Sequence, residues 1–380
     1  MKAGAAPREG AAPAGRARAL IPGLRAAAAA TEAARRVPDA AIAALRDAGL
    51  YRILQPVRFG GSEGELATVC DAAIEIGRGC AATAWVYATT ATYTWVVGMF
   101  PPAAQEELWG AHPDAIVGAS VAPSGKAAAA DGGFRLAGTW SFSSGCDNAD
   151  WWSVGMPVPA PDGGVEPALA LLPPGAWTIE DNWHVLGLAG TGSKNVVVAD
   201  RFVPAHRVLR VREAQSGNPP GAAVNRDPLY RVPMLAVIAA CLAAPGIGAA
   251  HGALDAFRAL RRRGSGEAAD RAAAAIDAAR TLLLRDCREA FATVRGGGAL
   301  TLDQRLRFRR HHAFSVRLAV QAADALVEAA GGAALADAPD LQRSWRDAQA
   351  VAKHISLNWD AVGTQAGRQL LGLEPGPGQY

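Results

Sequence analysis

The sequence predicts a mostly helical α+β protein with an N-terminal helical domain, a central β domain and a C-terminal four-helix bundle. Apolar residues recur at three- and four-residue steps in both end regions, whereas short β-prone runs alternate with turn residues in the middle. The chain has 380 residues and is 50% hydrophobic, so it can bury a core large enough for two or three domains.

The N-terminal helical domain is expected at residues 19–114, after a disordered tail at 1–18 that mixes Ala, Gly, Pro and Arg. Residues 83–99 are nearly all apolar, which predicts a helix that is buried on every side. A proline and a glycine pair interrupt the helical pattern at 50–61, as expected of a connecting loop.

The central β domain is expected at residues 115–212 and should be a sandwich or a barrel. Strands are predicted at 115–121, 134–142, 151–156, 168–172 and 194–203. The tripeptide Asp131-Gly132-Gly133 predicts a hairpin turn ahead of the second of these strands.

The C-terminal domain is expected at residues 228–380. Its long helical segments are predicted at 232–263, 267–295, 301–330 and 339–371, and glycine-rich connections separate them. Long helices with short connections predict a four-helix bundle, which we expect oligomerisation to extend.

Composition narrows the function classes. The formal net charge is only +3, with both signs interspersed, which argues against nucleic-acid binding. Five cysteines lack CxxC pairing, so we expect small buried thiols and no metal site. No secretory signal and no apolar run of membrane-spanning length were identified, so we expect a cytoplasmic protein that does not bind a membrane.

The most informative segment is 343–363, which has the period of an amphipathic helix. Its predicted apolar stripe consists of Trp345, Ala348, Ala352, Ile355, Trp359 and Val362. His354 lies beside this stripe, where a cleft could reach it. A lone histidine in such a place is either a functional group or an ordinary, partly buried side chain, and the pattern leaves both interpretations open.

Six short segments, spread over most of the chain, carry a resemblance to a known family. They are LYRILQP at 50–56, FGG at 59–61, ATAWV at 82–86, GTWSFSSG at 138–145, GLAGTGS at 187–193 and FVP at 202–204. In this order they resemble the acyl-CoA dehydrogenase superfamily. Within it they are similar to the reduced-flavin-dependent (group D) monooxygenases, the oxygenase components of two-component aromatic hydroxylases such as 4-hydroxyphenylacetate 3-hydroxylase.

The resemblance implies a set of flavin contacts. At 138–145 the family's strand end meets the flavin, which implicates Trp140, Phe142, Ser143 and Ser144. Ser143 best matches the hydroxyl that bonds the flavin N5 region, with Ser144 not excluded, and a serine-rich turn that caps itself remains the alternative.

Further contacts are implied for a glycine turn and a basic cluster. The residues of the turn are Thr191, Gly192 and Ser193, although an ordinary turn would look the same. Arg263 matches an arginine near the cofactor phosphate, and its neighbours Arg261 and Arg262 are equally possible.

On the substrate side the resemblance implies Trp85, Tyr93 and Ser120. Ser120 could equally be an ordinary serine in a surface loop, and Tyr93 could simply pack in the core. Many aromatic hydroxylases of this branch carry a second histidine where Tyr93 is the nearest polar residue here. The departure leaves the substrate open between a phenol, a biosynthetic aromatic, an indole, an amino sugar and a sulfur compound.

The family also contains dehydrogenases of acyl thioesters, which need a carboxylate base. Neither of the family's two positions for this base, near 353–355 and within 241–248, holds Asp or Glu. The oxygenase branch instead carries a histidine at the first position, which His354 supplies. There, reduced flavin and oxygen form a C4a-hydroperoxide, and a histidine with an ordinary pKa near about 6.5 suits a base or a hydrogen-bond partner.

The resemblance therefore implies reduced FMN or FAD as cofactor, with FMNH2 favoured, and O2 as co-substrate. No G-x-G-x-x-G follows a strand, so we expect a separate NAD(P)H:flavin reductase as partner. The family implies a homotetramer. Two alternatives stay open: a flavin-dependent acyl-CoA dehydrogenase, and a catalytically silent binding subunit.

Overall fold

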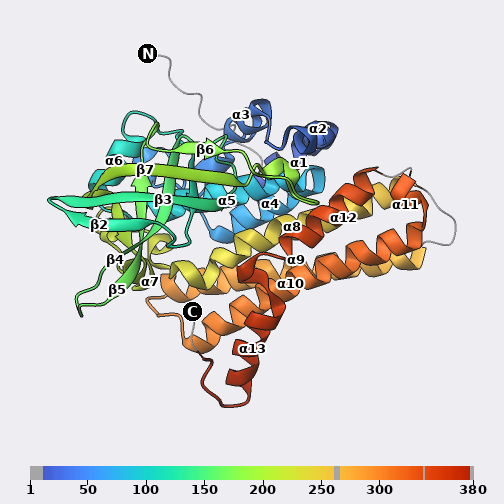
Figure 1. Cartoon of the computed structure of the whole chain (residues 1–380). Coiled ribbons are helices and arrows are strands. Elements are labelled where there is room, and N and C mark those ends of the chain that lie inside the picture. Colours follow the sequence, from blue (N-terminus) through green and yellow to red (C-terminus); the bar gives the residue numbers. More distant parts are fainter. Residues whose placement is uncertain (1–11, 261–265, 337–338, 377–380) are drawn as a thin grey trace.

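The computed structural model describes residues 12–260, 266–336 and 339–376. A β sandwich occupies one end of the molecule, and long helices run away from it (Figure 1). Helices α1 to α3 lie along one side of the helical part. The predicted fold class, with helices at both ends of the chain and β structure between them, is confirmed.

The N-terminal helices cover one side of the bundle. They are α1 (Pro13–Ala19), α2 (Ile21–Ala34), α3 (Asp39–Asp47), α4 (Leu66–Gly79), α5 (Ala81–Val97) and α6 (Pro102–Trp109), with short 3-10 turns η1 (Leu50–Arg52) and η2 (Val57–Phe59). Helix α5 is buried on every side, as predicted.

The prediction of a disordered tail is wrong from residue 13 onward. Arg18 of α1 donates two hydrogen bonds to the buried carboxylate of Glu75, at 3.2 and 2.8 Å. The Arg16 guanidinium donates to the Ala48 carbonyl at 2.7 Å. These contacts dock α1 on the domain, while residues 1–11 lie outside the described residues.

The β domain consists of two four-stranded sheets, ordered β1-β4-β5-β8 and β2-β3-β7-β6. The strands are β1 (Val117–Ser120), β2 (Lys126–Ala130), β3 (Gly133–Ser143), β4 (Trp151–Pro159), β5 (Val165–Leu172), β6 (Thr178–Glu180), β7 (Lys194–Pro204) and β8 (Val208–Arg210). The predicted hairpin turn joins β2 to β3, and Gly132 has the positive φ that this turn requires (+73°). The sequence did not predict β2, β6 and β8, which are short or rich in alanine.

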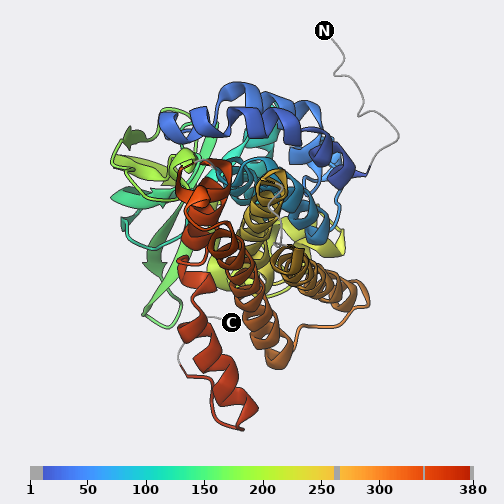
Figure 2. The ribbon, with the colours of Figure 1, turned by 90° about the vertical axis from the view of Figure 1, so that its right-hand side faces the viewer.

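Four helices form the bundle. They are α8 (Met234–Ala259), α9 (Gly266–Arg295), α10 (Leu302–Ala330) and α12 (Pro339–Val351). Three shorter helices are α7 (Val211–Gln215), α11 (Ala333–Ala336) and α13 (Trp359–Leu370). The remaining 3-10 turns of the described chain are η3 (Ala189–Thr191), η4 (Ala205–Arg207), η5 (Pro220–Ala223), η6 (Pro228–Arg231) and η7 (Ile355–Leu357). Helix α13 projects away from the body of the molecule (Figure 2). A capping box, in which Thr301 and Gln304 exchange hydrogen bonds, begins α10.

Helix α8 corrects one expectation. By length and composition it could cross a membrane, although no apolar run of that length was expected from the sequence. In the fold it packs against α4, α10 and α12, and 78% of its most apolar window is buried. It is therefore the central core helix, and its apolar character follows from burial on all sides.

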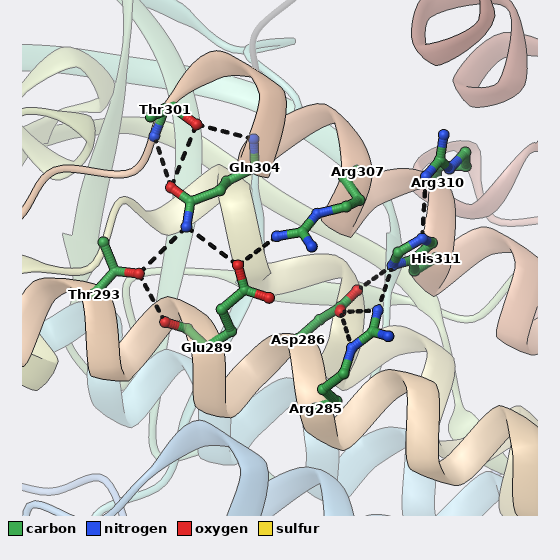
Figure 3. A network of polar contacts seen from close by, with 9 residues as sticks. All are labelled: Arg285, Asp286, Glu289, Thr293, Thr301, Gln304, Arg307, Arg310 and His311. Atoms are coloured by element: carbon green, nitrogen blue, oxygen red, sulfur yellow. Dashed lines mark hydrogen bonds and ion pairs between the residues drawn. The ribbon is translucent and has the colours of Figure 1, made fainter. Parts of the chain in front are cut away.

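A charged network joins α9 to α10 (Figure 3). Asp286 is fully buried and accepts hydrogen bonds from Arg285 at 2.8 Å and from the His311 ring at 2.8 Å. Glu289, one turn further along α9, pairs with Arg307 and accepts from the Gln304 amide at 3.2 Å. Each carboxylate is thus matched by a donor on the facing helix.

The two helical regions share one hydrophobic core, whereas the β domain has its own. Helices α4 and α8 meet through Gly77 and Gly248: a Cβ on Gly248 would lie 2.5 Å from the Ile74 carbonyl oxygen. Only glycine permits this approach of two helix backbones. All five cysteines are buried free thiols, as predicted.

Candidate active site

Strand β3 ends in an irregular turn that orients the predicted serines. Its register with β7 shifts between Trp140 and Ser143, and Phe142 adopts a left-handed conformation (φ +59°). As a result the Phe142 ring is 74% exposed, whereas the next side chain, Ser143, is fully buried. The local conformation therefore places neighbouring side chains in different environments.

Trp140 does not lie where the sequence predicted. Its side chain is enclosed between the two sheets, 1% exposed, and its indole N–H donates to the Gly155 carbonyl at 2.9 Å. Because the register shift falls after this residue, Trp140 keeps the inward orientation of the strand. A direct contact with a flavin is incompatible with this position.

Ser143 and Ser120 form a buried pair. Their hydroxyl oxygens are 2.6 Å apart, Ser143 donates to the Trp140 carbonyl at 2.9 Å, and Ser120 accepts from the Trp152 indole at 3.2 Å. Both hydroxyls are thus occupied inside the β domain.

A second group of hydroxyls lies beside this pair and forms a continuous chain. The Ser144 and Ser193 oxygens are 2.7 Å apart, and so are those of Ser193 and Thr191. Trp85, on α5, donates its indole N–H to Ser144 at 2.9 Å. The end of β3, the turn η3 and helix α5, which are far apart in sequence, therefore contribute to one polar chain, which we call the hydroxyl chain (Thr191, Ser193, Ser144).

His354 lies on the other side of Trp85 from Ser144, but not on a helix. Helix α12 ends at Val351, and His354 is the extended N-cap residue (φ −63°, ψ 136°) of the turn η7. Its ring packs 5.6 Å from the Trp85 ring. The predicted continuous helix at 343–363 is wrong, and Ile355 of its apolar stripe is 82% exposed.

The environment of His354 fixes its charge and its tautomer. Burial lowers the pKa of the imidazole to about 4, well below the ordinary value expected from the sequence, so the ring is neutral at pH 7. Its Nδ1 accepts the Ser356 backbone N–H at 3.2 Å, which places the ring proton on Nε2. His354 thus presents a hydrogen-bond donor.

The remaining predicted residues differ in their placement. Tyr93 is buried in α5 and has no hydrogen-bond partner among the described residues; burial raises the pKa of its hydroxyl above its ordinary value. Gly192 needs its positive φ (+54°), and a Cβ there would meet Asp147 at 2.7 Å. Arg263, with Arg261 and Arg262, lies outside the described residues.

Sequence reasoning missed two residues near the hydroxyl chain. Asp347 on α12 is buried and accepts the Leu188 backbone N–H at 2.6 Å, and burial raises the pKa of its carboxyl to about 6. Trp183 packs edge-on against Phe142, with ring centroids 5.9 Å apart. The adjacent pair Arg346-Asp347 in the sequence was the available signal for the first, whereas no local pattern marked Trp183.

These groups fit a planar heterocycle with hydrogen-bonding edges. Neutral hydroxyls can bond ring nitrogens and oxygens in either direction, and the exposed Phe142 ring with its neighbour Trp183 offers aromatic surface beside them. A flavin has this combination of edge and face.

Comparison with known proteins identifies the family of the chain. Residues 19–111 match the N-terminal domain of acyl-CoA dehydrogenases, and residues 240–359 match the C-terminal domain. The oxygenase component of FADH2-dependent resorcinol hydroxylase from Rhizobium sp. (strain MTP-10005) is 44% identical, over 94% of this chain and 93% of that protein. The chain belongs to the acyl-CoA dehydrogenase family.

Within this family it is a flavin-dependent monooxygenase, the oxygenase component of a two-component system, and it uses reduced flavin and O2. The 3-HSA hydroxylase from Rhodococcus sp. RHA1 superposes with a TM-score of 0.91 at 34% identity, covering 98% of this chain and 99% of that one. XiaF from Streptomyces sp., solved with FADH2 and glycerol, gives 0.87 at 28% identity, with 97% of both chains covered. The two alternatives left open by the sequence, an acyl-CoA dehydrogenase and a catalytically silent subunit, are therefore not supported.

Proposed function

We propose that this monooxygenase hydroxylates a monocyclic hydroxyarene of the resorcinol type, using FADH2 supplied by a separate NAD(P)H:flavin reductase. The observation that carries the proposal is the hydroxyl chain together with Trp85, whose indole N–H bonds Ser144 and whose ring packs against the neutral ring of His354. A relative at 44% identity, named for resorcinol, supports the substrate class.

Each residue of the site has a task in this proposal. When bound, the reduced flavin reacts with oxygen and supplies the atom that is transferred. Ser144 and Ser193 would bind the polar edge of the flavin ring, and the Nε2 proton of His354 would bond the substrate hydroxyl or the oxygen being transferred. Trp85 orients both sides, because its indole N–H bonds Ser144 while its ring packs on His354.

Ser144 replaces Ser143 as the preferred flavin contact. The Ser143 hydroxyl is fully buried and already bonds Ser120 and the Trp140 carbonyl. Ser144 is only partly buried and belongs to the hydroxyl chain, and it accepts the indole N–H of Trp85, which packs on His354. A hydrogen bond to the flavin from Ser144 therefore needs no rearrangement of the β domain.

FAD is the cofactor we propose in place of FMN, which the sequence favoured. The relatives at 44% and 28% identity are named or solved with FADH2. Equal activity with reduced FMN and reduced FAD at limiting flavin would contradict this preference.

We also propose that the protein is a cytoplasmic homotetramer. Several large apolar side chains around α13 are exposed in the single chain: Ile355, Leu370, Leu371 and Leu373. Apolar surface of this kind is expected to be covered by another copy of the chain. Sedimentation equilibrium tests the tetramer, and the buried free thiols support a reducing compartment.

The decisive experiment supplies the purified protein with chemically reduced FAD, ¹⁸O2 and resorcinol. We expect a trihydroxybenzene that carries one ¹⁸O atom, detected by mass spectrometry. Heat-denatured protein with the same reagents controls for reaction in solution. Formation of hydrogen peroxide alone, across a panel of monocyclic phenols, would refute the substrate class.

A further inference from the structure

The segment between β6 and β7 carries two hydroxyls of the site and contains a strained residue. Leu188 has a left-handed backbone conformation (φ +56°), which residues other than glycine rarely adopt. Thr191 and Ser193 follow it within five residues. The surrounding structure must therefore hold Leu188 in place.

The Leu188 carbonyl is bonded from within its own segment. It accepts the Thr191 backbone N–H at 3.1 Å, the Thr191 hydroxyl at 2.8 Å and the Trp183 indole N–H at 3.2 Å. The backbone conformation of Leu188, which orients this carbonyl, thus sets the position of Thr191, the first member of the hydroxyl chain.

The Leu188 N–H has a different kind of partner, because it donates to the Asp347 carboxylate of α12 at 2.6 Å. Helix α12 lies directly against the segment: a Cβ on Gly187 would be 2.3 Å from the Arg346 carbonyl oxygen. Arg346 also donates to the Leu186 carbonyl while it pairs with Glu32. Leu188, the strained residue, is therefore held in place by helix α12 of the bundle.

Asp347 itself is 6% exposed and has no ion-pair partner within 4 Å among the described residues. The charged and titratable groups that face it are Glu32 of α2, Arg343 and Arg346 of α12, and Cys80 at the start of α5. Glu32 is paired with both arginines, which lower its pKa against the effect of burial, and burial raises the pKa of the Cys80 thiol. Among these groups, Asp347 is the one expected to change charge between pH 5 and pH 7.

We propose that Asp347 is a positioning residue of this monooxygenase: through the Leu188 amide it holds Thr191 and Ser193 in the arrangement that receives the flavin. The inference rests on the proposed flavin site. Asp347 does not touch the hydroxyl chain; it acts through the backbone of one residue, Leu188, whose N–H it accepts and whose carbonyl bonds Thr191.

The test compares Asp347→Ala, which removes the acceptor, with Asp347→Asn, whose amide oxygen can still accept the Leu188 N–H. Hydrogen–deuterium exchange of residues 181–193 is measured on the flavin-free protein, and FADH2 affinity is measured anaerobically by fluorescence. In Asp347→Ala we expect the protection of the segment and the flavin affinity each to fall about ten-fold, as for loss of one strong hydrogen bond. In Asp347→Asn both should stay within about three-fold of the wild type.

The effect of pH separates positioning from general stabilisation. A carboxylate accepts more strongly than a carboxylic acid, so wild-type flavin affinity should weaken from pH 7 to pH 5, whereas that of Asp347→Asn should not. The pH comparison between the wild type and Asp347→Asn still tests the positioning role if Asp347→Ala does not fold. Equal losses of affinity and thermal stability in Asn and Ala variants, or a pH profile of Asp347→Asn identical to the wild type, would overturn the proposal.

Asp286→Asn is the matched control. It makes the same chemical change at another fully buried carboxylate, in the network between α9 and α10 (Figure 3). It should lower thermal stability and leave the exchange of residues 181–193 unchanged. Because exchange is measured without flavin or substrate, failure of the resorcinol reaction would not be mistaken for failure of this inference.

Discussion

Asp286 and Asp347 are both buried aspartates on helices of the bundle, yet the protein treats them in opposite ways. Burial alone would raise the pKa of either carboxyl. At Asp286, hydrogen bonds from His311 and Arg285 outweigh burial, and the pKa is lowered. At Asp347 a single backbone N–H is the nearest donor, burial dominates, and the pKa rises to about 6.

The difference separates the network between α9 and α10 from the proposed flavin site. Between α9 and α10, carboxylates face guanidinium groups and a histidine, so the charge is compensated within the helix pair. Beside the hydroxyl chain, Asp147 is paired with Lys194 at 3.0 Å, whereas Asp347 has no ion-pair partner among the described residues. Buried groups that keep unused bonding capacity are the ones able to respond to a ligand.

Among the tests of this comparison, His354→Ala has the largest expected effect. Loss of a positioned donor should reduce hydroxylation about a thousand-fold, within the range for general acid–base groups. Product formation with reduced FAD measures it, while FADH2 affinity should stay nearly unchanged. His206→Ala is the control and should retain activity, because His206 lies in the turn η4 after β7 and pairs with Glu107 of α6. Full activity of His354→Ala would remove His354 from the mechanism.

A second test uses the pH dependence of stability. The folded state raises the pKa of Asp347 from 3.8 to about 6. Between these two pH values the folded protein binds more protons than the unfolded chain, so the contribution of Asp347 to the free energy of unfolding is lost as pH rises. His354 has the opposite sign: its pKa falls from 6.5 to about 4, so its contribution is lost as pH falls. Each is worth up to about 3 kcal/mol, and in the wild type they nearly cancel.

Single variants should reveal how each group makes the free energy of unfolding depend on pH, measured by urea unfolding between pH 4 and pH 6.5. In Asp347→Asn the free energy of unfolding should rise with pH by about 3 kcal/mol more than in the wild type. In His354→Gln it should rise by about 3 kcal/mol less. Parallel curves for all three proteins would show that neither group is buried as described.

Asp286→Asn tests the compensated side of the comparison. The amide still accepts one bond, but it removes the negative charge that faces the Arg285 guanidinium and the His311 ring, so we expect a loss of about 2 kcal/mol in the free energy of unfolding. Differential scanning calorimetry measures it. Product formation per folded molecule should not change. A parallel loss of activity would contradict the view that Asp286 contributes to stability alone.

The smallest expected effect is that of Trp85→Phe. This change keeps an aromatic ring against His354 but removes the N–H that bonds Ser144, a loss of about 1 kcal/mol, or about five-fold in flavin affinity. A double-mutant cycle with Ser144→Ala isolates that bond. Additive effects of the two changes would mean that the two side chains are not coupled.

Features set by local pattern were predictable from the sequence. The burial of α5 follows from its unbroken apolar run, and the principal strands follow from β-prone residues between turns. Ser144, Thr191 and Ser193 came from the resemblance, and the structure brings them together. Their mutual contacts depend on the fold, since β3, η3 and α5 meet only in three dimensions.

Other features could not be seen in local pattern. The left-handed Phe142 follows from the register of β3 against β7, and phenylalanine is no signal for that conformation. The break at His354 did leave a trace: Asn358 caps α13 by accepting the Ala361 N–H at 3.0 Å. The apolar period across 343–363 masked this capping signal. Asp347 acquires its role only because Gly187 lets the chain approach α12 closely.

The close contact of Gly77 with Gly248 also constrains how the chain can fold during synthesis. Helix α4 is complete by residue 79, yet the helix that it packs against begins only at residue 234. The N-terminal helices therefore emerge from the ribosome with an unfinished core, and they must wait for more than 150 residues before α8 can cover them. In a nascent chain that stops before α8, the apolar face of α4 would stay open to chaperones and to aggregation.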